Sequence, residues 1–154
     1  MSAGDPQAVV QWREALLWLA KADADIFGAR TLLAGGQPDL AAFHVQQALE
    51  KALKALLVAA AQDVRRSHDI DMLATLARGH WPDLLPAPFA LAAVSQWYVT
   101  TRYPDPDAML PTAAEVGEAL EAAASLIAAI IALSPSAARE DRDDSGAGAD
   151  IEQH

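Results

Sequence analysis

The stretch Ala42-Phe43-His44-Val45-Gln46-Gln47-Ala48-Leu49-Glu50-Lys51-Ala52-Leu53-Lys54-Ala55-Leu56-Leu57 decides the fold of this chain. Its apolar residues recur at intervals of three and four, which is the period of an amphipathic helix. They form one stripe: Val45, Ala48, Leu49, Ala52, Leu53, Leu56 and Leu57. Pro38-Asp39 stands upstream, where proline is favoured in the first turn of a helix. The sequence therefore predicts a helix from about residue 38 to about residue 61.

Proline, glycine and capping residues divide the neighbouring sequence into further helices. Asp5-Pro6 is expected to open a helix over residues 6–34, which Gly35-Gly36 ends. Ser67 is expected to cap a short helix that Gly79 ends.

Two more helices follow towards the C-terminus. A helix from Phe89 to about Arg102 is expected to end at Tyr103-Pro104, because a residue before proline is pushed out of the α region. Thr112-Ala113-Ala114-Glu115 is a capping box, which opens a helix that continues to Leu133. No strand pattern occurs, so the sequence predicts an all-α fold, a five-helix up-and-down bundle.

Length and charge set the domain boundaries and limit the function classes. The 154 residues suit one domain, expected over residues 6–134, and the acidic, Gly- and Ala-rich segment 135–154 is expected to be a disordered tail. The net charge is −10, so any contact with nucleic acid would need a local basic patch. The chain has no Cys, which excludes disulfides and thiol chemistry.

The sequence also favours a cytoplasmic protein with no bound metal. No secretory signal is expected in residues 1–10, and the longest apolar segment, 119–133, falls short of the roughly 20 apolar residues that cross a bilayer. A buried helix is expected there. The four histidines, His44, His68, His80 and His154, lie in separate elements, so neither a metal site nor another cofactor is expected.

Alternation of the helices sorts the loops into two ends of the bundle. The loop before His68 and the loop after Arg102 are expected at one end, together with the beginning of the first helix. The polar residues gathered there would be His68, Asp69, Arg102, Tyr103, Asp105 and Asp107. Arg102 is then either a latch that binds a neighbouring carboxylate or a phosphate ligand with His68 as general acid or base.

A polar stripe follows the apolar stripe of the second helix. His44, Gln47, Lys51 and Lys54 are spaced three, four and three residues apart, so they lie along one side of that helix. This side is either a solvated face or a groove that recognises phosphate or an acidic partner.

The last helix is apolar almost all round. One core stripe needs only part of its apolar residues, which leaves Leu126, Ala129 and Leu133 on another side. We therefore expect a homodimer, with this helix or the one before it in the contact. The alternative is an Ala-rich composition that serves no interface.

Three stretches together resemble the HEPN family, small α-helical proteins of prokaryotes that are often encoded beside a minimal nucleotidyltransferase. These are residues 42–57, Ser67-His68-Asp69-Ile70 and Thr101-Arg102-Tyr103-Pro104-Asp105, and the resemblance spans about residues 12–133. It implies a four-helix bundle with a short extra helix. Several family members are RNases or RNA-targeting toxins, in which an arginine is followed after four to six residues by a histidine. In this chain, the positions after Arg102 hold Asp107, Ala108 and Met109 instead, so the chain resembles the branch that lacks the complete motif.

The resemblance implies a binding and assembly module that acts with a minimal nucleotidyltransferase, in a toxin–antitoxin-like or nucleotide-handling pair. One alternative is a metal-independent RNase toxin that uses Arg102 and His68. Another is a non-catalytic nucleotide-binding regulator, in which Lys51, Lys54 and Arg102 would bind the phosphates.

Overall fold

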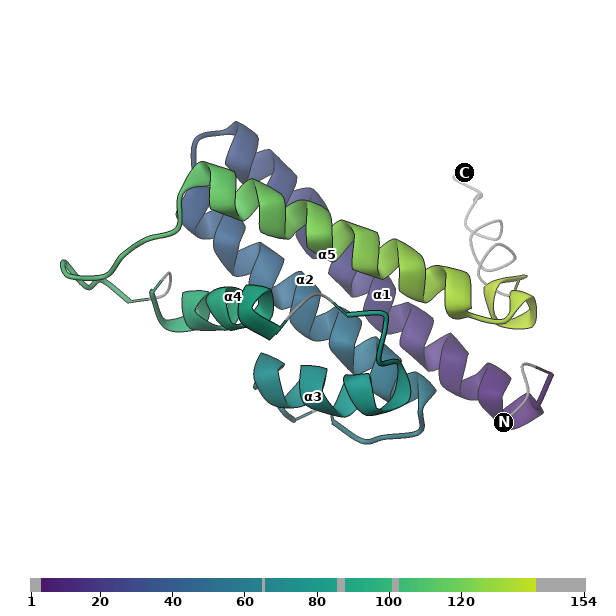
Figure 1. Cartoon of the computed structure of the whole chain (residues 1–154). Coiled ribbons are helices and arrows are strands. Elements are labelled where there is room, and N and C mark those ends of the chain that lie inside the picture. Colours follow the sequence, from purple (N-terminus) through teal and green to yellow (C-terminus); the bar gives the residue numbers. More distant parts are fainter. Residues whose placement is uncertain (1–3, 65, 86–87, 101–102, 141–154) are drawn as a thin grey trace, which may run out of the picture.

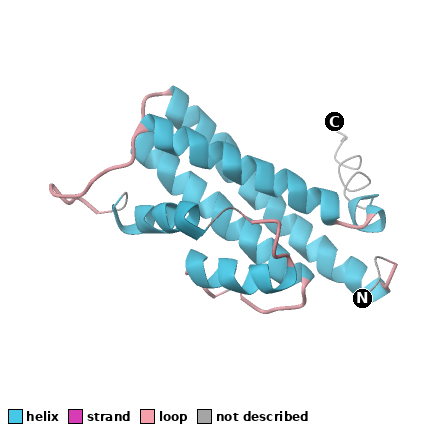
Figure 2. Ribbon diagram, viewed as in Figure 1, coloured by secondary structure: helices cyan, strands magenta, loops and turns pink. Residues whose placement is uncertain are grey.

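The computed structural model describes residues 4–64, 66–85, 88–100 and 103–140, and within residues 88–100 it describes the side chains of residues 91–97. All regular structure in these ranges is helical (Figures 1 and 2). The helices are α1 (Pro6–Ala34), α2 (Pro38–Ala59), α3 (Ile70–His80), α4 (Pro88–Thr100) and α5 (Ala113–Leu133). The predicted all-α fold is confirmed, and the bounds of α1 and α5 are those expected.

Local capping interactions explain where these helices begin. The Asp5 side chain accepts a hydrogen bond from the Gln7 amide at 2.9 Å, ahead of Pro6. Thr112 Oγ1 accepts from the Glu115 amide at 3.2 Å and donates to the Glu115 carboxylate at 3.1 Å. At α3, the capping residue is Asp69 and not the predicted Ser67, because the Asp69 carboxylate accepts from the amide of Met72.

The core is built around α2, which the other four helices cover (Figure 1). Against α2, α1 presents a row of alanines seven residues apart, all completely buried: Ala15, Ala22 and Ala29. Small side chains at such spacing let two helices approach closely along their length. As a result, nearly the whole circumference of α2 is buried in its C-terminal half, where every residue from Ala52 to Ala59 is buried.

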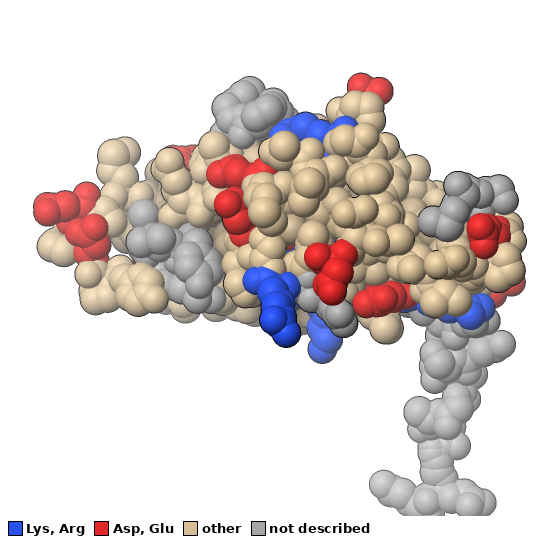
Figure 3. Space-filling view, turned by 90° about the horizontal axis from the view of Figure 1, so that it is seen from below, with Lys and Arg blue, Asp and Glu red and all other residues tan. Residues whose placement is uncertain are grey.

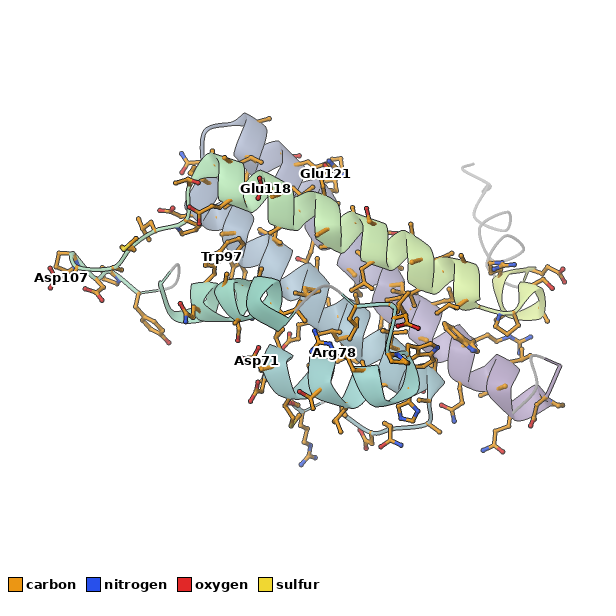
Figure 4. All side chains as sticks on the ribbon, in the orientation of Figure 1. Asp71, Arg78, Trp97, Asp107, Glu118 and Glu121 are labelled. Atoms are coloured by element: carbon orange, nitrogen blue, oxygen red, sulfur yellow. The ribbon has the colours of Figure 1, made fainter. Side chains whose placement is uncertain are left out.

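The direction of α3 departs from the expected alternation of neighbouring helices. Asp71 and Arg78 mark the two ends of α3 in Figure 4, and α3 runs in the same direction as α2. Residues 60–69 return along α2, because His68 contacts Glu50 in the middle of that helix. An extended segment of this length reaches about 30 Å, whereas the 11 residues of α3 span about 16 Å. The link is therefore long enough to make neighbouring helices parallel.

The reversed α3 places the loop after α4 at the other end of the bundle. That loop leads into the beginning of α5, which lies beside the end of α1, where Gly117 faces Leu33 and Arg30 contacts Glu121 at 2.5 Å. It therefore shares an end with the turn at Gly35-Gly36 and not with the beginning of α1, contrary to the prediction (Figure 1). The other four helices do alternate, so α3 is the short extra helix.

By length and composition, α5 could cross a membrane, with a mean hydropathy of 1.9. Core helices pass the same test, and α5 lies against α1 and α2. Leu126, which was predicted to lie on a spare apolar side, is only 4% exposed, whereas Leu133 is 44% exposed. Of the face predicted to meet a partner, Leu126 therefore belongs to the core, whereas Ala129 is partly exposed and Leu133 faces solvent.

The described structure continues past the predicted domain boundary at residue 134. Residues 136–140 are helical, and Ala138 is buried in the core. The Arg139 guanidinium donates to the carbonyl oxygens of Ile131 and Ser134 at 3.1 and 2.7 Å, which caps the end of α5. Most of the predicted acidic tail, residues 141–154, lies outside the described residues.

Candidate functional site

Asp25 of α1 joins that helix to the polar stripe of α2. Its Oδ1 accepts a hydrogen bond from Nδ1 of His44 at 2.9 Å, and its Oδ2 accepts one from Nζ of Lys51. His44 and Lys51 are two helical turns apart, so both reach the same side of α2. The Asp25 side chain is 12% exposed, whereas those of Lys51 and His44 are 26% and 35% exposed. We call these three residues the Asp25 centre.

The ring of His44 is held in one orientation. A Cβ at Gly28 of α1 would lie 3.6 Å from Nδ1 of His44, so this position on α1 is in close contact with the ring. The ring of Phe43 meets it edge-on, with 5.4 Å between centroids. Because a carboxylate accepts hydrogen bonds, Nδ1 of His44 is the donor to Asp25.

A second carboxylate, that of Glu50 in α2, also contacts a histidine and a lysine. Its Oε1 accepts from Nδ1 of His68 at 2.9 Å and lies 3.9 Å from Nζ of Lys54. The side chains of Glu50 and Lys54 are each 4% exposed, and Nζ of Lys54 lies 5.4 Å from the ring centroid of Trp18. A cation over an aromatic face is attracted to it, most strongly where water is excluded. We call Glu50, Lys54 and His68 the Glu50 centre.

The burial of Lys54 changes the predicted polar stripe. The stripe does lie on one side of α2, but at its C-terminal end Lys54 lies inside the protein and is available to no ligand on the surface. Gln47 Nε2 donates to Oε1 of Gln46 at 2.8 Å, and Gln46 is completely buried. The part of the stripe that faces solvent is therefore His44, Gln47 and Lys51.

The residues predicted to gather around His68 do not all lie together. Asp69 does lie next to His68 and is engaged as the cap of α3. Tyr103 is 63% exposed on the loop that leads from α4 to α5. Asp105 accepts from the amide of Asp107 at 3.0 Å, which is a turn internal to that loop.

The same loop stands apart from the beginning of α3. Figure 4 shows Asp107 at the tip of the loop, far from Asp71 in the first turn of α3. The reversed direction of α3 is the reason that the predicted neighbourhood is wrong. Arg102 lies outside the described residues.

Asp25 and Glu50 are the site residues that the sequence reasoning missed. Glu50 precedes Lys54 by four residues, a spacing typical of an exposed ion pair on a helix, whereas this pair is buried. The sequence did not distinguish Asp25 from Asp23 on the same helix, because it does not say which side of α1 meets α2. The seven-residue spacing of His44 and Lys51 could have indicated an acid on the facing helix.

The described surface gives little support for the binding of an anionic ligand through clustered positive charge. On the face seen in Figure 3, Lys and Arg side chains lie in small, separate groups among Asp and Glu. Among the described residues, no three His, Asp or Glu side chains are arranged to hold a metal ion. Because each of Lys51 and Lys54 has a carboxylate partner, neither centre carries the uncompensated positive charge that phosphate binding uses.

An apolar groove of about 400 Å³ lies where α2, α4 and α5 meet. Trp97 of α4 points into this region in Figure 4 and is 7% exposed. Glu115 and Glu118 of α5 also line the groove, so its polar side chains are acidic. The groove is lined by no residue of either carboxylate centre.

The comparisons with known proteins agree on the family. The model of the HEPN domain matches residues 15–133. The chain is similar in structure to TT1696 from Thermus thermophilus, with 31% identity over 77% of this chain and 96% of that one, and a TM-score of 0.61. It is also similar to ST0689, an archaeal HEPN homologue, with 25% identity over 77% and 95% of the two chains and a TM-score of 0.58. No curated protein matches the chain. With the family model covering most of its length, the chain belongs to the HEPN domain family.

Proposed function

We propose that this protein is a non-catalytic HEPN binding and assembly module, which acts in the cytoplasm with a minimal nucleotidyltransferase. The pair would be toxin–antitoxin-like or would handle nucleotides. Family membership supports the module, and the acidic and apolar residues in the histidine positions after Arg102 support the lack of catalysis.

The engagement of His68 by Glu50 is the observation that carries the proposal. A replacement for the missing histidine would have to approach Arg102 from the segment before α3. His68 is instead bonded to a buried carboxylate in the middle of α2, while the loop that follows Arg102 leads away to the beginning of α5. The bond to Glu50 supports a structural role for His68 on α2 and not a catalytic one.

One observation favours the alternative, a metal-independent RNase toxin that uses Arg102 and His68. The ring of His68 is 68% exposed, and Glu50 holds its Nδ1. Its Nε2 is then free to accept or donate a proton, which is how a carboxylate orients a catalytic histidine. The third candidate, a nucleotide-binding regulator, loses support because Lys54 is buried and Lys51 is paired with Asp25.

The test measures partner binding and RNA cleavage on the same protein. The genes beside that of this chain are searched for a minimal nucleotidyltransferase, which is co-expressed with the full chain, and complex formation is measured by co-purification and light scattering. In parallel, the purified chain is incubated with single-stranded RNA in EDTA. We expect a stoichiometric complex and intact RNA.

Variants separate the two functions. Metal-independent cleavage that is lost in both Arg102→Ala and His68→Ala, with thermal unfolding near that of the wild type, would establish the RNase and refute the proposal. Cleavage that survives both substitutions would indicate a contaminating nuclease. Intact RNA with no complex would refute the partner half of the proposal and leave the non-catalytic half standing.

A further inference from the structure

The apolar groove lies between α4 and α5, which both pack on α2. The contacts of α4 are mainly with α2 and α3, whereas those of α5 are mainly with α1 and α2 (Figure 1). On the side of α5 that lines the groove, the side chains of Ala119, Ala122 and Ala123 are short. These small side chains therefore keep open a space of about 400 Å³ between two helices that share α2 as a neighbour.

The walls of the groove are apolar and are held in place by the fold. Leu91, Val94 and Trp97 of α4 line it, and all three side chains are buried. Leu49 of α2, which also lines the groove, is buried as well. Preformed spaces of about 300–1,000 Å³ with apolar and aromatic linings are typical of sites for small organic molecules. The groove therefore has the size and the lining of a small-molecule site.

The polar side chains of the groove are two carboxylates, Glu115 and Glu118 of α5, and its described lining contains no Lys, Arg or His. The Thr112 hydroxyl donates to Glu115 at 3.1 Å, but a neutral donor leaves the negative charge uncompensated. Glu118 has no hydrogen-bond or ion-pair partner among the described residues. Glu121, one turn further along α5, differs because Arg30 binds it. The groove therefore combines an apolar lining with two negative charges, which attract a cation.

Trp97 adds a second attraction for a cation. It points from α4 into the region of the groove, whereas Glu118 projects from α5 (Figure 4). The face of an indole ring attracts an ammonium group, and it does so more strongly where water is partly excluded. An aromatic ring and carboxylates in one apolar groove therefore favour a ligand that has an apolar body and one positive charge.

Charge disfavours the occupants that this chain itself could supply. The chain has a net charge of −10, and its last residues, 141–154, are rich in Asp and Glu. Either a second copy or the C-terminal segment would bring further negative charge to Glu115 and Glu118. A phosphate-bearing ligand would be repelled for the same reason. The complementary occupant is a separate, positively charged molecule.

We propose that the groove between α4 and α5 binds a small organic cation, an amine with an apolar body. The ammonium group binds at Glu118 and Glu115, and the apolar body lies against Val94, Trp97 and the alanines of α5. The carboxylates select the charge of the ligand, and the volume of the groove limits its size. This site shares no residue with the Asp25 centre or the Glu50 centre, and it does not depend on the proposed function.

The first test compares three probes that share one apolar body. At neutral pH phenylbutylamine is a cation, phenylbutanol is neutral and phenylbutyrate is an anion, and isothermal titration measures their affinities for the full chain. Phenylbutylamine is expected to bind with a Kd of about 1 mM or lower, and at least about tenfold more tightly than phenylbutyrate. Phenylbutanol should lie between the two. No binding of the amine, or equal binding of the alcohol or the acid, would refute the proposal.

Two pairs of variants test the residues of the groove. Glu118→Gln removes one charge at constant size, and it should weaken amine binding by about three- to tenfold without changing that of phenylbutanol. Glu14→Gln, at an exposed residue of α1, changes the net charge equally and is the control. Ala122→Phe should fill the groove and weaken binding of both probes by about tenfold or more, whereas Ala128→Phe, at an exposed residue of α5 outside the groove, should not. Equal effects within either pair would contradict the proposed site.

Nuclear magnetic resonance locates the bound probe. The indole N–H signal of Trp97 is identified by its loss in Trp97→Phe, and it is expected to shift when phenylbutylamine is added. The signals of Trp12 and Trp18, which lie on α1, should stay in place. Shifts confined to Trp12 or Trp18 would place the amine elsewhere and overturn the proposal. If the amine does not bind while Ala122→Phe prevents the complex with a nucleotidyltransferase, the groove is a protein-docking surface, and the small-molecule proposal is likewise overturned.

Discussion

The Asp25 centre and the Glu50 centre use the same chemistry in different surroundings. Each is a carboxylate that binds one histidine and approaches one lysine. In the Asp25 centre, the lysine reaches solvent and the carboxylate is partly exposed. In the Glu50 centre, the carboxylate and the lysine are both buried, and the histidine is the exposed member. Burial therefore makes the Glu50 centre a structural clamp between α2 and the segment before α3, while the Asp25 centre keeps polar groups at the surface.

Reversing the charge of each lysine separately is expected to give the largest difference between the two centres. Lys54→Glu would bury a second carboxylate beside Glu50, at a cost above about 4 kcal/mol, and we expect loss of cooperative folding. Lys51→Glu would repel Asp25 at a partly solvated position, at a cost of about 1–2 kcal/mol. Circular dichroism with urea unfolding measures both. Lys54→Met and Lys51→Met keep the apolar part of the side chain without its charge, and they serve as controls. Equal losses of stability in Lys54→Glu and Lys51→Glu would contradict the claim that burial distinguishes the two centres.

Removing the buried carboxylate is expected to be the next largest effect. Glu50→Ala leaves Lys54 buried without its carboxylate, which costs about 3–5 kcal/mol in the free energy of unfolding. Glu50→Ala/Lys54→Met removes both charges and should recover much of that loss. A double-mutant cycle on urea unfolding gives the coupling between the two. If the double variant is less stable than Glu50→Ala, the pair is not the source of the effect.

The sequence predicts the features of the fold that depend on interactions between neighbouring residues. Asp5-Pro6 and the Thr112 capping box act within one helical turn, so the beginnings of α1 and α5 follow from a few neighbouring residues. The HEPN resemblance also rested on short local stretches, and the family model and similar structures confirm it.

The sequence could not predict the features that depend on contacts between helices. Lys54 shares its side of α2 with Lys51, but it is buried, and its Nζ lies 5.4 Å from the ring centroid of Trp18 of α1. The direction of α3 depends on the path of residues 60–69, which no local pattern specifies. The expected gathering of His68 with Tyr103 and Asp105 failed for this reason.

A smaller effect is expected at the partly exposed carboxylate. Asp25→Ala removes the partner of His44 and Lys51, but both can turn to water, so we expect a loss of about 1–2 kcal/mol. Asp25→Asn keeps a hydrogen-bond acceptor for His44 and should lose less. Urea unfolding checks both variants. A loss as large as that of Glu50→Ala would show that the two centres do not differ in their dependence on burial.

The smallest effects on stability are expected at the two histidines. His68→Ala removes a donor from buried Glu50, so the loss should be about 1 kcal/mol although most of the ring is exposed. His44→Ala should cost less, because Lys51 continues to donate to Asp25. His68→Gln, which can still donate, is the matched control. Hydrogen exchange adds a local readout: His68→Ala should speed exchange at the amides around residues 66–69, whereas His44→Ala should leave them unchanged. If His44→Ala proves the more damaging variant, the Asp25 centre is the clamp and the assignment of the two centres is reversed.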